Sequence, residues 1–342
     1  MRRVRRVRRA LAAAAVAGLA AAACSRPVQT ARTTLIEPPT NAEIEAGLAI
    51  DYRSCSPNLG WLFPGLAQLC LGKKAEGAVM ASLAAAEIGT AVAVGIETDH
   101  DADGDGQADP FSHPGVYLPL AAVQDLWVYG LADAWITSAL ARRERFAPPD
   151  SAADLLAAPF NLEVMKRPVV WAGLIGALAV GLGVTFALSD DLDSDRVGDD
   201  PNLFGETVDA SYGYPLGGLA AGTLFAHVAL AEEALFRGYI QSTSARALGE
   251  TPGWVAASLL FGLAHVPNIY GLPEEDRDEY LLYGLPVITA AGFYLGWVYR
   301  HSDYSLAPST AIHFWYDFLL TATLFAIDPE NSIFAPSVMF TW

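Results

Sequence analysis

The sequence predicts an all-α fold, a polytopic transmembrane helix bundle with about eight spans. Of the 342 residues, 53% are hydrophobic and only 17% are charged, whereas soluble chains usually carry about a quarter charged residues. Several apolar runs reach the length of about 20 residues that crossing a bilayer requires. Acidic and basic residues also alternate between successive loops. The net charge of −17 argues against nucleic-acid binding.

Residues 1–24 have the organisation of an export signal. A segment rich in arginine precedes an Ala-rich apolar segment that ends at Cys24. The residues before Cys24 resemble a bacterial lipobox, in which the cysteine becomes the lipidated N-terminus. An ordinary signal peptide or a first membrane anchor is the alternative. Residues 25–56 are polar and predict a tether on the outer side of the membrane.

Residues 57–160 are expected to form an N-terminal membrane module with an acidic loop. Its predicted spans are 57–72, 77–96 and 116–141. The first two resemble small bacterial two-helix modules with a Pro-Gly-x-x-Gln…Gly…Lys-x-x-Gly pattern, which implies no chemistry. The remaining cysteines, Cys55 and Cys70, lie in or beside the first apolar run, so the sequence indicates neither a disulfide framework nor a metal site.

The acidic loop carries a candidate Ca²⁺ site. Its acids alternate with small residues, and hard oxygen ligands on a tight turn suit this ion; they are Asp101, Asp103, Asp105 and Asp109. The loop resembles the Ca²⁺ loops of thrombospondin-type repeats, but Ser112 stands where a glutamate would complete the ligand set. A solvated acidic loop is the alternative.

Residues 168–327 are expected to form the membrane core, followed by a C-terminal tail at 328–342. The predicted spans of the core are 168–188, one starting near 212, 254–269, 280–299 and 306–327.

The positive-inside rule orients these spans. Basic residues fall at alternate loops, and acidic loops at 97–109, 190–209 and 274–279 fall at the others. The rule places the basic loops in the cytoplasm and, with eight crossings, both ends of the mature chain outside. The expected location is a bacterial inner membrane, with its lipids as partners.

Residues 231–241 carry two adjacent acids and an arginine at the end of an uncharged run. Ionisable groups in such a setting are costly and usually functional. On a helix, Glu233 and Arg237 share one face, whereas Glu232 points about 100° away. Arg237 can therefore pair with Glu233 and leave Glu232 free.

Two further motifs place histidines in apolar segments. His265 follows Phe261 by one helical turn, and His313 precedes Asp317 by one turn. Each residue alone is more often a hydrogen-bonded core residue, but a carboxylate and two histidines from three helices match a water-activating or metal-binding set. The other histidines, His100, His113, His227 and His301, are left out of this set.

In this order, Glu-Glu-x-x-x-Arg, Phe-x-x-x-His and His-x-x-x-Asp resemble the motif set of the CPBP family. This family of bacterial intramembrane proteases includes the CAAX prenyl endopeptidases. The resemblance covers about 168–327 and implies peptide-bond hydrolysis within a helical membrane core. It implies that Glu232 activates water with help from His265, that Glu233 and Arg237 form a supporting ion pair, and that His313 and Asp317 stabilise the oxyanion or hold a metal.

The predicted function is therefore an intramembrane endopeptidase that cleaves a membrane-associated protein or peptide. A Zn²⁺ ion held by Glu232, His265 and His313 is one version of the mechanism, and a metal-free glutamate mechanism is the other. A non-proteolytic scaffold or bacteriocin-immunity factor on the same fold is the alternative function. A transporter would be expected to contain internal repeats, which the sequence does not show.

Overall fold

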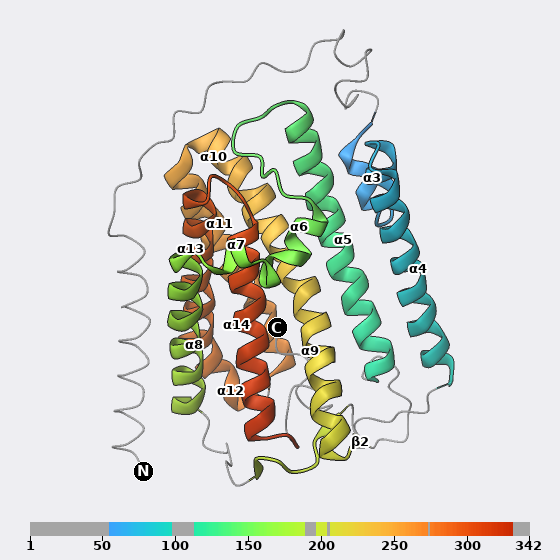
Figure 1. Cartoon of the computed structure of the whole chain (residues 1–342), viewed down its shortest axis with the longest axis vertical. Helices are drawn as coiled ribbons and strands as arrows, with labels where there is room; N and C mark the ends of the chain where they lie inside the picture. The colour runs from blue at the N-terminus through green and yellow to red at the C-terminus, as the bar shows by residue number, and fades with distance from the viewer. Residues whose placement is uncertain (1–54, 98–112, 189–195, 204–205, 273, 331–342) are drawn as a thin grey trace.

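The computed structural model describes residues 55–97, 113–188, 196–203, 206–272 and 274–330. Over this part of the chain the protein is an all-α bundle, as the sequence predicts (Figure 1). The long helices are α4 (Lys74–Glu97), α5 (Pro114–Ala141), α8 (Pro168–Leu188), α9 (Ala210–Glu232), α11 (Glu250–Ala264), α13 (Leu285–His301) and α14 (Ala307–Ile327). Shorter helices connect them: α3 (Leu66–Cys70), α6 (Ala152–Ala157), α7 (Leu162–Met165), α10 (Ser242–Leu248) and α12 (Glu274–Glu279). Two short strands, β1 (Asn202–Leu203) and β2 (Glu206–Thr207), pair antiparallel.

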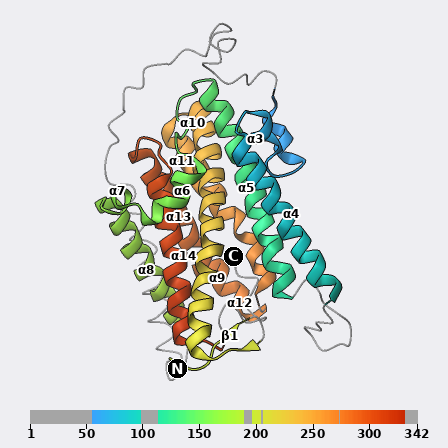
Figure 2. The ribbon, with the colours of Figure 1, turned by 45° about the vertical axis from the view of Figure 1, so that its right-hand side comes forward.

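Helix α14 lies against α8, α9 and α13, while α11 packs on α13 and α10 (Figures 1 and 2). Helix α5 joins the remainder of the bundle to α4. Its Leu126 and Tyr129 belong to the same buried cluster as Leu230 and Ala231 of α9. The N-terminal module is thus packed directly on the helix that carries the acidic motif.

Five helices of the described chain are long and apolar enough to cross a membrane, fewer than the eight expected spans. They are Lys74–Glu97, Pro168–Phe186, Ala210–Leu248, Asp276–His301 and Ala307–Ile327. Helix α5 has 28 residues, but Gln124, Asp125 and Asp133 make it more polar. Helix α11 has only 15 residues, less than the roughly 20 that a perpendicular crossing requires.

The expected first span at 57–72 is wrong. A 3₁₀-helix at Pro57–Trp61 and the five-residue α3 occupy this segment, and neither is long enough to cross a bilayer. Gly65 has φ 89°, and a Cβ atom there would lie 2.2 Å from the carbonyl oxygen of Gly77. The chain therefore turns back at Gly65 and passes directly over α4, which only glycine permits at this distance.

A buried polar cluster fixes this folded-back segment to α5. The Nζ atom of Lys73 lies 2.7 Å from Asp133 Oδ1 and 2.8 Å from Glu76 Oε2. The Nε2 atom of Gln68 donates hydrogen bonds to Asp133 Oδ2 at 3.0 Å and to the Gly130 carbonyl at 2.7 Å. Gln68, the Gln of the two-helix pattern, and Lys73, just before the Lys of that pattern, thus have a structural role, because they join α3, α4 and α5.

The same segment is closed by a disulfide bond between Cys55 and Cys70, which the sequence did not indicate. The turn at Gly65 brings the two cysteines together, with their Cα atoms 5.7 Å apart. A straight span over 57–72 would have separated them.

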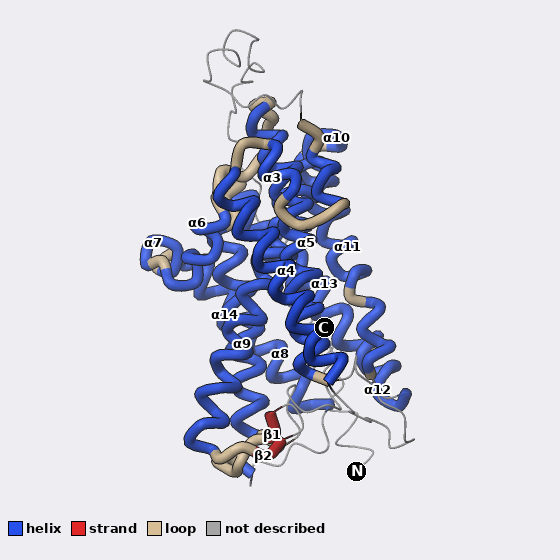
Figure 3. The backbone as a smooth tube through the Cα atoms, turned by 90° about the vertical axis from the view of Figure 1, so that its right-hand side faces the viewer, coloured by secondary structure: helices blue, strands red, loops and turns tan. Residues whose placement is uncertain are grey.

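The two ends of the bundle differ in charge. Helices α3 and α10 and the C-terminus of α5 lie at one end, which carries the basic loops, whereas α12, β1 and β2 lie at the acidic end (Figures 1 and 3). Because 57–72 does not cross, Ser56 at the end of the expected outer tether lies on the same side as Lys73. The sequence predicted the tether outside the membrane and Lys73 inside. This pair of predictions is wrong, because the fold places both on the same side.

Several sequence predictions lie outside the described residues and remain predictions. They concern the signal at 1–24 with Cys24, the tether up to residue 54, the tail beyond residue 330, and the calcium loop with Asp101, Asp103, Asp105 and Asp109.

The positive-inside rule predicts that the α10 end faces the cytoplasm. A membrane-impermeant maleimide applied to intact cells should then label a cysteine at Asp199, exposed at the acidic end, and not one at Thr243, exposed on α10. Permeabilised cells should label both variants. Labelling of the Thr243 variant alone would place the basic end, with its disulfide, in the outer compartment, where disulfides usually persist.

Candidate active site

The acidic motif lies where α9 continues into a π-helix, Glu233–Gln241. The sequence predicted an ordinary helix here; π segments are rare and often occur at functional sites. Arg237 Nη1 still reaches Glu233 Oε1, at 2.7 Å, and both side chains are fully buried. Glu232 lies 22 residues after Ala210, which corresponds to about 33 Å along a helix. The motif is thus close to the basic side of a hydrocarbon layer of about 30 Å.

Arg237 is held on two further sides. Its Nη2 donates a hydrogen bond to the Gly292 carbonyl of α13 at 3.2 Å, and its guanidinium lies 4.2 Å from the ring centroid of Phe261 on α11. A Cβ atom at Gly292 would lie 2.8 Å from Phe261 Cδ1, so glycine allows α11 and α13 to approach. Arg237 therefore joins three helices around the buried Glu233.

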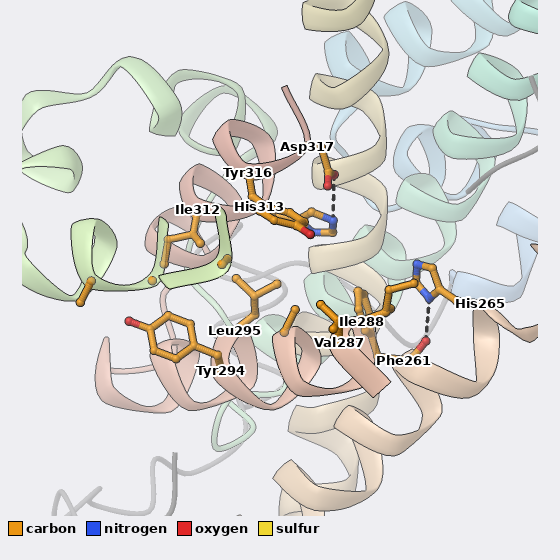
Figure 4. A pocket seen from close by; sticks show the side chains of 14 residues that line it. Phe261, His265, Val287, Ile288, Tyr294, Leu295, Ile312, His313, Tyr316 and Asp317 are labelled. Atoms are coloured by element: carbon orange, nitrogen blue, oxygen red, sulfur yellow. Dashed lines mark hydrogen bonds and ion pairs between the residues drawn. The ribbon is translucent and has the colours of Figure 1, made fainter. Parts of the chain in front are cut away.

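His313 on α14 lies between two carboxylates. Its Nδ1 is 2.9 Å from Glu233 Oε1, and its Nε2 is 3.3 Å from Asp317 Oδ2, one turn along the same helix (Figure 4). A protonated imidazole can donate one N–H to each carboxylate. One oxygen of Glu233 thus contacts both Arg237 and His313, and it fixes the orientation of the histidine ring.

His265 stands where α11 ends, because the α-helix stops at Ala264 and a 3₁₀-helix, Val266–Gly271, follows. The expected span at 254–269 is therefore shorter than predicted. The His265 Nδ1 lies 2.8 Å from the Phe261 carbonyl, which fixes its ring (Figure 4). The hydroxyl of Tyr280 donates a hydrogen bond to the His265 backbone carbonyl at 2.8 Å. These contacts direct Nε2 towards Glu232.

Glu232 occupies the centre of this arrangement. Its Oε1 lies 3.8 Å from His265 Nε2, and its Oε2 lies 3.7 Å from His313 Nε2. These distances are longer than direct hydrogen bonds. The buried Oε2 accepts no hydrogen bond from any described residue, although the side chain as a whole is 25% exposed. An unsatisfied buried acceptor calls for a donor such as water or a substrate N–H.

The six residues predicted from the three motifs thus come together from α9, the adjoining π-helix, α11 and α14. The histidines left out of the prediction bind elsewhere: His227 Nδ1 lies 3.0 Å from the Thr223 carbonyl, and His301 Nδ1 lies 2.8 Å from the Trp297 carbonyl. His113 accepts a hydrogen bond from the Gly115 amide at the start of α5, and His100 lies outside the described residues.

The predicted zinc ligands are close in pairs, since Glu232 lies near both histidines. Within the described parts of the chain, however, no group of three or more His, Cys, Asp and Glu side chains is arranged to hold a metal ion. His313 also has a carboxylate against each ring nitrogen. A metal ligand must offer a free nitrogen lone pair, so this ring suits proton donation better than coordination.

Sequence reasoning missed Asp125 on α5. This carboxylate is close enough to Glu232, and to Glu87 on α4, for electrostatic repulsion. The signal was present as a lone acid within the apolar segment 116–141, which by itself suggests a functional residue. The N-terminal module therefore places a carboxyl group near the site.

Comparison with known proteins agrees with this geometry. Residues 216–319 match the family model for type II CAAX prenyl endopeptidase, Rce1-like. This segment runs from α9 into α14 and contains all six site residues, whereas α4, α5 and α8 lie outside it. No curated protein and no solved structure matches the chain significantly.

Breaking the buried ion pair between Glu233 and Arg237 should strongly destabilise the protein. The substitution Arg237→Met should lower the free energy of unfolding by about 3–5 kcal/mol, because Glu233 would remain buried without its cation. The control Lys166→Met removes the cation of the exposed pair Glu163–Lys166 and should cost less than about 1 kcal/mol. Denaturant titration in detergent measures both values. Equal losses in the two variants would contradict the role given to Arg237.

Proposed function

We propose that this chain, which carries an Rce1-like domain of the CPBP protease family at residues 216–319, is an intramembrane endopeptidase that uses Glu232 to activate water. The observation that carries the proposal is the Glu232 carboxylate, whose two oxygens each face one histidine and whose Oε2 accepts no hydrogen bond from the described residues. The Nδ1 atoms of both histidines are already bonded, to the Phe261 carbonyl and to Glu233. A neutral amide is a poor electrophile, so its hydrolysis needs both a base for water and stabilisation of the oxyanion. The site offers a group for each task.

In the first step, Glu232 accepts a proton from a water molecule while the water oxygen bonds to the scissile carbonyl carbon. His265 orients this water through Nε2, because Nδ1 is bonded to the Phe261 carbonyl. General-base assistance of this kind contributes about 10²–10⁴-fold in rate. The partial exposure of Glu232 gives water access to the carboxylate.

In the second step, the oxyanion accepts a hydrogen bond from the Nε2–H of His313, which is shared with Asp317 at 3.3 Å, while Nδ1–H stays bonded to Glu233 and fixes the ring. Preorganised donors of this type cost no reorganisation during the reaction. Glu232 then delivers its proton to the amide nitrogen, the C–N bond breaks, and a carboxylic acid and an amine leave. Glu232 returns to its starting state.

The substrate that fits this position is a membrane-associated protein or peptide. Five of the six site residues, all but His265, lie on helices that are long and apolar enough to span a membrane, so a soluble protein would have to present an extended segment at the bilayer. A bacterial inner membrane, with approach from the cytoplasmic side or laterally through lipid, is the setting we propose. The choice of a bacterial membrane rests on the sequence of residues 1–24, and the cytoplasmic orientation of the site rests on the charge pattern of the loops alone.

The substitutions Glu232→Gln, His265→Ala and His313→Ala should each abolish cleavage while the protein stays in the membrane. The matched control is His227→Ala, a histidine on α9 that is bonded to the Thr223 carbonyl and should be dispensable. Comparative membrane proteomics should show an uncleaved protein that accumulates in the three variants and not in the control. If the Glu232→Gln variant fully complemented a deletion strain, so that the strain behaved like the wild type, a non-proteolytic binding function would replace this proposal.

A zinc-dependent version of the site, with Glu232, His265 and His313 as ligands, is the alternative that the sequence left open. When bound, the ion would polarise the scissile carbonyl and acidify water. Because a carboxylate faces each nitrogen of His313, we expect metal analysis of the purified active protein to find no stoichiometric zinc. Chelators should also leave activity intact. One zinc per chain, lost together with activity on chelation, would establish the metal version.

A further inference from the structure

A cavity of about 110 Å³ lies between α8, α11, α13 and α14, next to the proposed active site (Figure 4). His265, His313 and Asp317 are among the residues that line the cavity. The other lining residues are apolar or aromatic, as Val287 and Leu295 illustrate. The same histidines therefore face Glu232 on one side and an apolar space on the other.

Small residues of α8 create much of this space. Ala172, Gly173 and Ala177 line the cavity opposite the bulkier side chains of α13. A Cβ atom at Gly173 would lie 2.3 Å from the ring of Tyr294, so glycine lets that ring pack directly on α8. The Tyr294 hydroxyl donates to the Val169 carbonyl of α8 at 2.7 Å, so it needs no partner within the cavity.

The position of the cavity relates it to the reaction. Glu232 does not line it, but His265 and His313 do, and their Nε2 atoms lie 3.8 and 3.7 Å from the Glu232 carboxylate. A peptide whose scissile carbonyl lies at Glu232 and His313 would carry a neighbouring side chain within reach of the cavity. An apolar side chain would gain by leaving water. A charged side chain would lose its hydration there. Asp317 would not compensate for this loss, because it already faces His313.

We propose that this cavity is a specificity pocket for an apolar side chain of the peptide substrate, next to the scissile bond, and that Ala172 and Ala177 limit its size. The proposal rests on the proposed function and names the substrate class of the same site. Helix α8 lies outside residues 216–319. The pocket is therefore a feature of this chain that the family match does not define.

The test uses the full-length protein purified in detergent and a proteome-derived library of unlipidated peptides, with cleavage sites read by mass spectrometry. Peptides cut by the wild type and not by Glu232→Gln should show large apolar residues at one position beside the cleaved bond. The substitution Ala177→Phe should fill the cavity. It should lower cleavage beside large apolar residues by about tenfold or more and retain cleavage beside small ones.

The matched control is Ala179→Phe, the same change on an exposed position of α8 that does not line the cavity; it should keep the wild-type preference. If Ala177→Phe does not fold, the smaller change Ala172→Leu replaces it, with the same expectation. Cleavage that depends on Glu232 without an apolar preference, or a preference unchanged in a folded cavity variant, would overturn the pocket and leave the proposed function intact. If the library shows no cleavage that depends on Glu232, the pocket proposal is overturned as well. The proposed function would fail with it only if membrane proteomics also finds no protein that accumulates in Glu232→Gln.

Discussion

The interaction on which the site depends is the contact of one buried carboxylate oxygen, Glu233 Oε1, with both Arg237 and His313. A carboxylate without exposure is stable only when it is paired and hydrogen-bonded. Arg237 supplies the charge and extends the contact to α13 through the Gly292 carbonyl. His313 extends it to α14, where its second nitrogen faces Asp317. One charge thus fixes the relative positions of α9, α13 and α14. Glu232 is not part of this contact, and its Oε2 accepts no hydrogen bond from the residues that the structure describes.

The N-terminal module shapes the site although it lies outside the family match. Leu126 of α5 belongs to the same buried cluster as Leu230 of α9, and the Asp125 carboxyl of α5 lies close enough to Glu232 for electrostatic interaction. At the basic end, the contact between Lys73 and Asp133 fixes the folded-back segment to α5. The module therefore packs on the helix that carries the acidic motif, and its removal would expose a buried face of α9.

The sequence predicted the helical class and brought the six site residues into one hypothesis, because charged groups are conspicuous in apolar segments. It could not predict the path of 57–72, since hydropathy does not reveal that the turn at Gly65 lies over Gly77. The Cys55–Cys70 bond was missed for the same reason. The apolar run at 254–269 also concealed the end of α11 at Ala264, because composition does not mark where an α-helix changes to a 3₁₀-helix. Contacts between distant segments decide each of these points.

The central claim is a division of labour between two adjacent acids, in which Glu233 holds the site together and Glu232 carries out the chemistry. Parallel measurement of cleavage and of the denaturation midpoint for Glu232→Gln and Glu233→Gln tests this claim most directly. The account predicts that Glu232→Gln abolishes cleavage with a midpoint near that of the wild type, and that Glu233→Gln loses both activity and stability. A destabilised Glu232→Gln, or a stable and inactive Glu233→Gln, would contradict it.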